Sequence, residues 1–285
     1  MKKFIFILGA AVILLMAVAL VLFLIYADNT TIGITQYSVR NEKIPAGFEG
    51  YKIVQVADLH NTEFGENNEE LLSLIAQCEP DIIVFTGDQV DARKTDLNVV
   101  VEFAKQAVQI APCYLVTGNH EGSIIENRLL SNQLKDIGVN VLENAEVTLQ
   151  CGGDSLSLIG VSDPSTDYRS LEIGQAGAMD ELLAKLCKNT GGYTILLSHH
   201  PEFLELYSKY DAGLVLSGHA HGGQIRIKDQ GIIAPHQGLL PQYDGGEYSL
   251  GNTTMILSRG LGNSLFPWRI NNPPELVLVE LHTEG

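Results

Sequence analysis

A long uncharged segment near the start of the chain constrains how the rest can be arranged. From Phe4 to Tyr26, 23 consecutive residues carry no charged side chain. Because an α-helix rises about 1.5 Å per residue, a helix of this length spans the roughly 30 Å hydrocarbon core of a membrane. No second apolar run of comparable length follows. We therefore expect residues 1–30 to form a short N-terminus and a transmembrane anchor, and residues 31–285 to form one folded domain.

The charges around this segment predict its orientation. Lys2 and Lys3 precede it and Asp28 follows it, so the positive-inside rule predicts a cytoplasmic N-terminus and an extracytoplasmic domain. This is the pattern of a single-pass protein of the cell membrane. The alternative is a cleaved signal peptide, because residues 17–19 resemble a processing site. Against it, the apolar run continues to Tyr26, whereas the apolar core of a signal peptide is only about 7–15 residues long.

Composition excludes some classes of partner. The chain has 34 acidic and 18 basic side chains, which give a formal charge of -16 at pH 7. This is the wrong sign for a protein that neutralises phosphates along a nucleic acid, so no nucleic-acid partner is expected. The four cysteines show no CxxC spacing, which argues against a thiolate zinc site or a thioredoxin-like redox pair. The oligomeric state stays open.

Short β-branched runs alternate with amphipathic segments through the domain. An alternating pattern around Gly152, Gly153 and Asp154 predicts a hairpin between residues 140 and 161. This mixture predicts an α/β fold, a layered sandwich whose sheets contain both parallel and antiparallel strands. The predicted strands are 52–57, 81–86, 114–117, 193–198 and 214–217, and the predicted helices are 69–78, 97–110, 128–137, 178–186 and 202–207.

Histidines gather at the ends of the predicted strands. Six of the eight follow a strand candidate and stand beside Asp, Asn, Gly or Ser: His60, His120, His199, His200, His219 and His221. In open α/β sheets, ligands bind at the carboxyl ends of the strands. These side chains can therefore meet in one site although they are spread over the sequence.

The residue types at these strand ends suit metal ions. Asp58 and His60 are two apart, as are His219 and His221, and this spacing directs both side chains of a pair to one side of an extended segment. Asp88 follows a glycine and can share its two oxygens between neighbouring cations. The candidate ligands are Asp58, His60, Asp88, Asn119, one of His199 and His200, His219 and His221. Nitrogen and oxygen donors without sulfur suit manganese, iron or zinc, and this number suffices for two ions.

The same motifs carry a family resemblance. In chain order they read DxH, GDxxD, GNHE, SHxP and GHxHGGQ, and this set resembles the calcineurin-like metallophosphoesterases. The stretch from Gly251 to Leu281 is similar to a membrane-anchored or secreted bacterial branch grouped with UDP-2,3-diacylglucosamine pyrophosphatase-like proteins. The resemblance implies an α/β/β/α sandwich with mixed sheets. It also implies hydrolysis of phosphoester or pyrophosphate bonds by in-line attack of a hydroxide that bridges two divalent or mixed-valence metal ions.

The resemblance also implies a role for each site residue. One ion would be held by Asp58, His60, Asp88 and His221, and the other by Asp88, Asn119, His199 and His219. His199 is thereby favoured over His200, which would be a pocket residue. His120 would stabilise charge or protonate the leaving oxygen during catalysis, and Asp91 would orient His120.

Several residues keep alternative interpretations. Asp91 could instead cap the following helix, and His200 could lie at the surface. Arg259 and Arg269 are candidate phosphate contacts, with surface or ion-pair roles as the alternative. Glu121 has no assigned role. His236 and His282 stand outside any motif and are expected to be structural or exposed.

Two functional hypotheses follow. The first is the metal-dependent phosphoesterase, and proximity to a bilayer favours lipid-linked or envelope phosphates as its substrates. The second is a catalytically silent, membrane-tethered binding module of the same fold. The silent module predicts missing ligands, and none of the expected ligands is missing from the sequence. A metallo-β-lactamase-like hydrolase would need an HxHxDH run, which the sequence does not contain.

Overall fold

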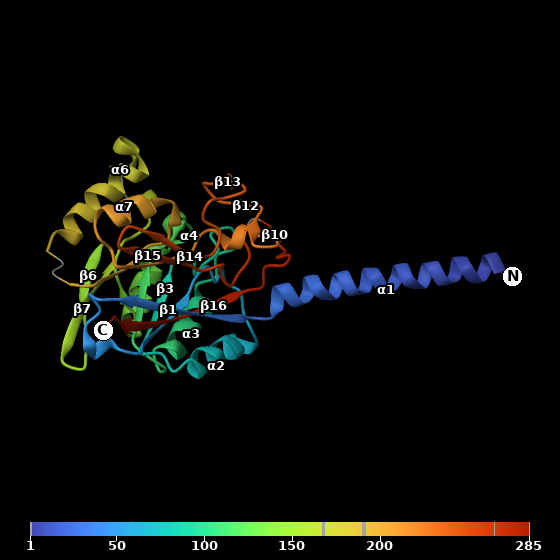
Figure 1. Ribbon diagram of the computed structural model, residues 1–285, viewed down its shortest axis with the longest axis horizontal. Coiled ribbons are helices and arrows are strands. Elements are labelled where there is room, and N and C mark those ends of the chain that lie inside the picture. The colour runs from blue at the N-terminus through green and yellow to red at the C-terminus, as the bar shows by residue number, and fades with distance from the viewer. Residues whose placement is uncertain (1, 167–168, 190–191, 265, 285) are drawn as a thin grey trace.

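Two six-stranded sheets lie face to face, and helices cover the outer face of each sheet (Figure 1). The computed structural model describes residues 2–166, 169–189, 192–264 and 266–284. Its α-helices are α1 (Lys2–Thr30), α2 (Glu69–Gln77), α3 (Leu97–Ala107), α4 (Asn119–Ser123), α5 (Asn127–Asp136), α6 (Arg169–Leu186) and α7 (Leu204–Lys209). The 3-10 helices are η1 (Ala46–Phe48), η2 (Glu66–Asn68), η3 (Pro164–Thr166), η4 (Cys187–Asn189), η5 (Pro201–Phe203) and η6 (His221–Gly223).

The first sheet is mixed. Its strand order is β1-β16-β2-β3-β4-β5, in which β16 is antiparallel to β2 and the remaining neighbours are parallel. Its strands are β1 (Gly33–Asn41), β16 (Glu275–Thr283), β2 (Tyr51–Val56), β3 (Ile82–Thr86), β4 (Cys113–Val116) and β5 (Asn140–Val141).

The second sheet is also mixed. Its order is β14-β15-β9-β8-β7-β6, with parallel central strands and an antiparallel pair at each edge. Its strands are β14 (Gly246–Leu250), β15 (Thr253–Leu257), β9 (Leu214–Ser217), β8 (Thr194–Leu197), β7 (Asp154–Gly160) and β6 (Ala145–Cys151). Two short ribbons lie outside both sheets, formed by β10 (Arg226–Ile227) with β11 (Gln230–Gly231) and by β12 (Ile233–Ala234) with β13 (Gly238–Leu239).

Burial on both faces explains why the central strands read as continuous apolar runs. Every residue of β3, β8 and β9 is buried. One apolar cluster fills the space between the sheets and includes Ile53, Val84, Ile195 and Leu214. A second cluster joins the first sheet to α2, α3 and α5, and a third joins the second sheet to α6 and α7. The predicted α/β/β/α sandwich with mixed sheets is therefore confirmed.

Most predicted elements correspond to observed ones, with instructive differences. The hairpin lies where it was predicted, with Gly152 and Gly153 at its turn. The predicted helix at 178–186 is the second part of α6, which begins at Arg169 and is interrupted at Gly174. The edge strand β1 was not predicted, because its sequence contains few apolar residues and no motif, and only Val39 is buried.

The segment α1 is a long helix that projects away from the domain (Figure 1). Its Gly9–Thr30 part is long and apolar enough to cross a membrane by length and composition, and none of it is buried inside the protein. The end of α1 is fastened to the domain, because the side chain of Asn29 accepts the backbone N–H of Arg269 at 2.9 Å. The apolar helix and the folded domain are thus joined by defined contacts.

Candidate metal centre

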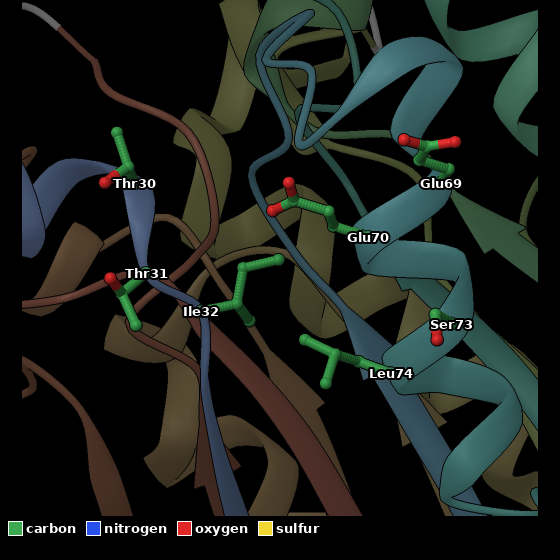
Figure 2. Close-up of a pocket in the computed structure, with 7 residues that line it drawn as sticks. All are labelled: Thr30, Thr31, Ile32, Glu69, Glu70, Ser73 and Leu74. Atoms are coloured by element: carbon green, nitrogen blue, oxygen red, sulfur yellow. The ribbon is translucent and has the colours of Figure 1, made fainter.

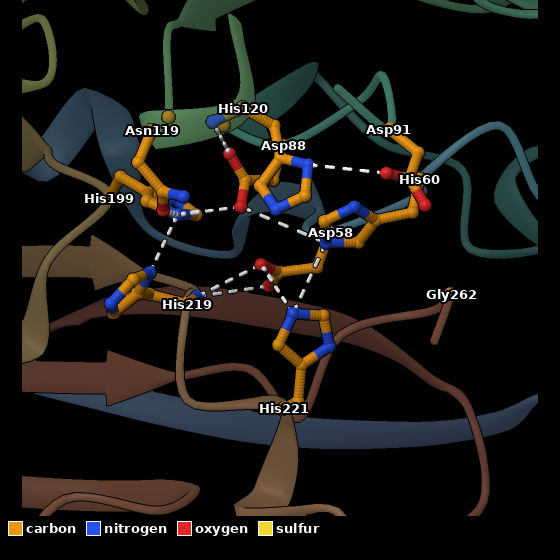
Figure 3. Close-up of polar contacts among 12 residues, drawn as sticks. Asp58, His60, Asp88, Asp91, Asn119, His120, His199, His219, His221 and Gly262 are labelled. Atoms are coloured by element: carbon orange, nitrogen blue, oxygen red, sulfur yellow. Dashed lines mark hydrogen bonds and ion pairs between the residues drawn. The ribbon is translucent and has the colours of Figure 1, made fainter. Parts of the chain in front are cut away.

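The ends of five buried strands supply the side chains of one cluster. Asp58 and His60 follow β2, and Asp88 follows β3. From the second sheet, His199 follows β8, and His219 and His221 follow β9. Asn119 follows β4. The structure brings all seven predicted ligands together, as Figure 3 shows.

The distances between ligand atoms divide the cluster into two groups, and Asp88 belongs to both. Asp58, His60, Asp88 and His221 are all buried, and their ligand atoms lie within 4.8 Å of one another. Asp88, His199 and His219 form a second buried group by the same measure. One carboxylate thus faces both groups.

The first group is built from facing imidazoles and carboxylates. Nε2 of His60 lies 3.1 Å from Nε2 of His221. The same nitrogen of His60 is 3.7 Å from Oδ2 of Asp88, and Nε2 of His221 is 3.5 Å from Oδ1 of Asp58. Atoms that are ordinary metal ligands therefore converge on one point.

The second group is centred on His199. Its Nε2 lies 3.2 Å from Oδ2 of Asp88, 3.2 Å from Oδ1 of Asn119 and 3.1 Å from Nδ1 of His219. Its Nδ1 lies 2.8 Å from the carbonyl oxygen of Thr86. A backbone carbonyl can only accept a hydrogen bond, so Nδ1 carries a hydrogen and donates it. In the neutral ring this leaves the Nε2 lone pair directed at the cluster.

Burial sets the protonation of three of the imidazoles. Desolvation lowers the pKa of His60 to about 4, with Asp88 opposing the shift and His120 adding to it. Burial also lowers the pKa of His219 and of His221 well below the usual value, and neighbouring imidazoles add to the effect. These rings are neutral at pH 7, which is the form that binds metal ions. The pKa of His199 is raised instead, because Asp88 and Asp58 outweigh the effect of its burial.

The two carboxylates lie in unlike environments. Burial raises the pKa of Asp58 to about 7, opposed by the charge of His199 and reinforced by that of Asp88. Burial acts on the pKa of Asp88 in the same direction, but the charge and the hydrogen bond of His199 outweigh it and hold that pKa well below its usual range. Asp88 is therefore the ionised carboxylate between the two groups of the cluster.

The backbone at five of the candidate ligands adopts the left-handed conformation, which residues other than glycine rarely adopt. Asp58, His60, Asp88, His219 and His221 all have positive φ, between 48° and 75°. Such residues are uncommon outside glycine and persist where the surroundings fix them. Here the N–H of Asp58 donates to the carbonyl of Gly87 at 3.1 Å, and the N–H of His219 donates to Oδ1 of Asp58 at 3.0 Å.

Two glycines leave room for the carboxylates. A Cβ atom on Gly118 would stand 2.3 Å from Oδ1 of Asp88. A Cβ atom on Gly218 would stand 2.5 Å from Oδ2 of Asp58. Any other residue at these positions would displace a carboxylate, which explains the glycines directly before Asn119 and His219.

A buried carboxylate supports the Asp88 turn from behind. Glu121 accepts the backbone N–H groups of Asp88 (2.8 Å), Gln89 (2.7 Å), Val90 (3.0 Å) and Gly118 (2.8 Å). Burial raises the pKa of Glu121 to about 7, with the charge of Asp88 adding to the shift. Glu121 had no assigned role from sequence. Its position directly after Asn119 and His120 was the one sequence feature that placed it near the candidate ligands.

His120 lies at the margin of the cluster, with its ring 4.5 Å from that of His60 in an edge-to-face arrangement. Its Nδ1 accepts the backbone N–H of Ala92 at 3.0 Å, while Oδ1 of Asp91 is 3.5 Å from the same atom. The carboxylate of Asp91 is bound by the guanidinium of Arg93 at 2.7 and 2.9 Å. Asp91 does not cap the following helix, because Asp96 is the N-cap of α3.

Comparison with known proteins agrees with this geometry. The family model for calcineurin-like phosphoesterases matches residues 51–223, which include every residue of the cluster. The chain belongs to the calcineurin-like phosphoesterase family. It is thereby a metal-dependent phosphoester hydrolase by class.

Full-length relatives support the assignment. This phosphoesterase is 29% identical over 262 residues to the metallophosphoesterase YkuE of Bacillus subtilis, covering 90% of this chain and 87% of the relative. It is 31% identical over 255 residues to a metallophosphoesterase of Aquifex aeolicus, covering 88% of this chain and 92% of the relative. It is 27% identical over 237 residues to the phosphodiesterase YaeI of Escherichia coli, covering 81% and 82%.

His200 lies behind the cluster of this phosphoesterase and is buried. Its Nδ1 lies 2.8 Å from Oε1 of Glu202, and its Nε2 contacts Oδ2 of Asp163. Burial lowers the pKa of His200, but Asp163 and Glu202 outweigh it and raise the value to about 9. His200 is thus held between two carboxylates, and its ring packs 4.4 Å from that of His219.

Besides Glu121, a further residue of the site region was missed by the sequence analysis. His236 was expected to be structural or exposed, and its side chain is 49% exposed. Yet its Nδ1 lies 3.0 Å from Nε2 of His219. It stands in an uncharged loop segment without any motif, so the sequence offered no indication that it would reach a ligand.

Neither candidate phosphate-binding arginine faces the cluster with a free guanidinium. Arg269 is fully buried and donates to the carbonyls of Arg259 at 2.9 Å and Gly262 at 2.6 Å. Arg259 forms an ion pair with Glu275 at 2.9 Å. The phosphate-contact interpretation is therefore wrong for Arg269, and the ion-pair alternative holds for Arg259. His282 pairs with Glu49 at 2.8 Å near the end of the chain, away from the cluster.

Two pockets are relevant to the site. The first lies at the end of α1, and the second lies beside the metal centre. One, of about 610 Å³, is formed between the end of α1 and α2 and is lined by Thr31, Ile32, Glu69, Glu70 and neighbouring residues (Figure 2). No imidazole lines it. The other, of about 550 Å³, is mostly apolar and is lined by Gln224, Ile225, Ile233, Ala234, Pro235, His236, Gly238, Ser264 and Phe266. His236 connects this second pocket to the cluster.

Replacement of Glu121 tests its supporting role. In Glu121→Gln a neutral amide replaces the carboxylate. All four N–H donors lose a charged acceptor, and the two that donate to the replaced oxygen lose their acceptor altogether. We expect a loss of about 1.5–3 kcal/mol in the free energy of unfolding, the usual value of a hydrogen bond to a charged group. Denaturant titration of the full chain in detergent measures this loss.

The matched control is Glu126→Gln, the same change at an exposed position, with an expected effect within about 0.5 kcal/mol. Equal stability of the Glu121 and Glu126 variants would contradict the supporting role.

Proposed function

We propose that this protein is a dinuclear phosphoesterase in which Asp88 bridges two divalent or mixed-valence metal ions. The supporting observation is the position of its buried carboxylate between two groups of ligand atoms. Asp58, His60 and His221 would complete one site, and Asn119, His199 and His219 the other. Imidazoles, carboxylates and an amide oxygen suit manganese, iron or zinc.

Two such ions would supply Lewis-acid polarisation of the phosphoryl group and activation of water for in-line displacement. The chain's own contribution is a rigid, water-poor setting for these groups. Glu121 and the two glycines fix Asp88 and Asp58 in position. The ions would also neutralise buried negative charge, which allows an anionic substrate to approach an acidic protein.

His120 is the proposed catalytic side chain. Because its Nδ1 accepts the N–H of Ala92, the proton of the neutral ring resides on Nε2. From Nε2 the ring could donate a hydrogen bond that stabilises the negative charge developing on the leaving oxygen of the substrate. Asp91, whose Oδ1 lies 3.5 Å from Nδ1, would hold the ring in this position. Asp91 is in this account a positioning residue.

The proposal extends to the membrane. Residues 1–30 would cross the cell membrane once with the N-terminus in the cytoplasm, and residues 31–285 would form the extracytoplasmic phosphoesterase domain. The apolar, unburied α1 supports a spanning helix, and the positions of Lys2, Lys3 and Asp28 support this orientation.

Lipid-linked or envelope phosphates are the proposed substrates. The apolar pocket of about 550 Å³ has His236 in its wall, and His236 contacts the ligand His219. A phosphate ester bound at the ions could therefore extend an apolar chain into this pocket. The anchor would hold the site close to a source of such substrates.

A pair of substitutions separates metal binding from catalysis. In His120→Ala we expect both ions to be retained and turnover to fall by about 10²–10³-fold, the usual effect of removing one hydrogen-bond donor to developing charge. In Asp88→Asn we expect metal content and turnover to be lost together, because the shared ligand loses its charge. Elemental analysis and a panel of monoester, diester and pyrophosphate substrates measure both properties.

The matched control for Asp88→Asn is Asp136→Asn, the same change at an exposed position of α5. It should alter neither metal content nor turnover. Near-normal turnover of Asp88→Asn would contradict the bridging role, and loss of metal from His120→Ala would make His120 a ligand. A metal-loaded chain inactive on the whole panel would favour the silent binding module.

The substrate proposal is tested by a pocket variant. Ile233→Asn introduces a polar group into the pocket wall and removes a contact worth about 1.5–3 kcal/mol. We expect kcat/KM to fall at least tenfold for a phosphate ester with a long acyl chain, and to stay unchanged for a water-soluble phosphodiester. Equal effects on the two substrates, or none on either, would contradict an apolar substrate chain in this pocket.

A further inference from the structure

Large apolar side chains are exposed together beside the candidate metal centre. They come from the β10–β13 ribbons and from the loop before β16, and we call this set the apolar rim. Its members are Ile227, Ile233, Leu239, Leu240, Phe266 and Trp268, which are between 39% and 74% exposed. A patch of this kind on a soluble surface marks a contact with another molecule or with a membrane.

The two segments of the rim form one connected unit. Ile225 and Ile270 form a β-bridge. The N–H of Arg226 donates to the carbonyl of Ile270 at 3.0 Å, and the side-chain amide of Asn271 donates to the carbonyl of Arg226 at 3.3 Å. The loop that carries Trp268 and the β10–β13 ribbons are therefore held together by these backbone and side-chain hydrogen bonds.

The same loop is bound to the end of α1. The amide side chain of Asn29 accepts the N–H of Arg269 at 2.9 Å and donates to its carbonyl at 3.0 Å. Asp28 accepts the N–H of Asn271. Figure 1 shows β10, β12 and β13 on the side of the domain from which α1 projects. Trp268 of the rim is therefore the sequence neighbour of Arg269, the residue to which the end of α1 is hydrogen-bonded.

The charge distribution favours a lipid surface. Residues 230–243 and 260–268 contain no Asp, Glu, Lys or Arg, although the chain has 34 acidic and 18 basic side chains. An acidic surface would be repelled by anionic lipids, and these segments avoid that repulsion. Tryptophan is enriched at the level of lipid headgroups, and Trp268 lies next to the residue that binds the end of α1.

We propose that the apolar rim enters the membrane leaflet in which α1 ends, as a second membrane contact of the domain. This inference rests on the proposed function only in that α1 spans the membrane. Ile233 and Phe266 belong both to the rim and to the wall of the apolar pocket. Embedding the rim therefore opens the pocket toward the leaflet and holds the metal centre at a fixed height above it.

Trp268 reports directly on this contact, because it is the single tryptophan of the chain. The full chain is reconstituted into phosphatidylcholine vesicles that contain spin-labelled phosphatidylcholine, with the label near the headgroup or near the chain end. We expect tryptophan fluorescence to be quenched more strongly by the label near the headgroup. We also expect iodide in the surrounding buffer to quench it less than in the detergent-solubilised, urea-unfolded chain.

A matched pair of variants completes the test. Leu239→Ser combined with Leu240→Ser should at least halve the quenching by lipid labels, while Leu171→Ser should leave it unchanged. Leu171 is 91% exposed and lies in α6, on the opposite side of the domain from α1. Both variants should retain the wild-type unfolding midpoint, since all three leucines are exposed.

Flotation of the vesicles distinguishes failure of the anchor from failure of the rim. If the chain floats with the vesicles after an alkaline wash but Trp268 is open to iodide and insensitive to lipid labels, the rim proposal is overturned and the anchor stands. If Trp268 is shielded only at high protein-to-lipid ratio, a second copy of the chain covers the rim, and the proposal is likewise overturned. A chain that does not float would contradict the anchor itself.

Discussion

Two carboxylates buried in the same cluster are the constraint on which the rest of the structure depends. Asp58 and Asp88 are 0% and 2% exposed, and burial of a carboxylate costs several kcal/mol unless opposite charge compensates it. Three of the surrounding imidazoles have pKa values lowered by burial and supply no positive charge at pH 7, whereas His199 and Arg269 supply positive charge beside Asp88 and Asp58. In the proposed metal centre, cations between the carboxylates would add to this compensation.

The fold meets this constraint through the ends of its strands. Parallel strands of both sheets end at the cluster, so that residues from five chain segments arrive there with short connections. Sharp turns with positive φ at five ligands direct the side chains inward. Gly118 and Gly218 admit the carboxylates at distances that any Cβ atom would prevent. The apolar strands thus provide the rigidity that the strained turns require.

The sequence predicted the sandwich and the membership of the cluster because both depend on local patterns. Apolar strands ended in motifs of metal-ligating residues, and the carboxyl ends of strands converge. It did not predict β1, whose exposed edge position leaves a weak pattern. It did not predict the contacts of Glu121 and His236, because backbone hydrogen bonds and loop approaches depend on tertiary packing. Arg269 was misinterpreted for the same reason, since a basic residue in an acidic chain gives no sign that backbone carbonyls surround it.

The central claim is that two metal ions lie side by side with Asp88 between them. The most direct measurement is anomalous X-ray diffraction from crystals of the purified full chain, with data collected at the absorption edges of manganese, iron and zinc. The account predicts two anomalous peaks roughly 3.5–4 Å apart, each within bonding distance of an Asp88 oxygen. A single peak, or two peaks that do not share Asp88, would contradict it.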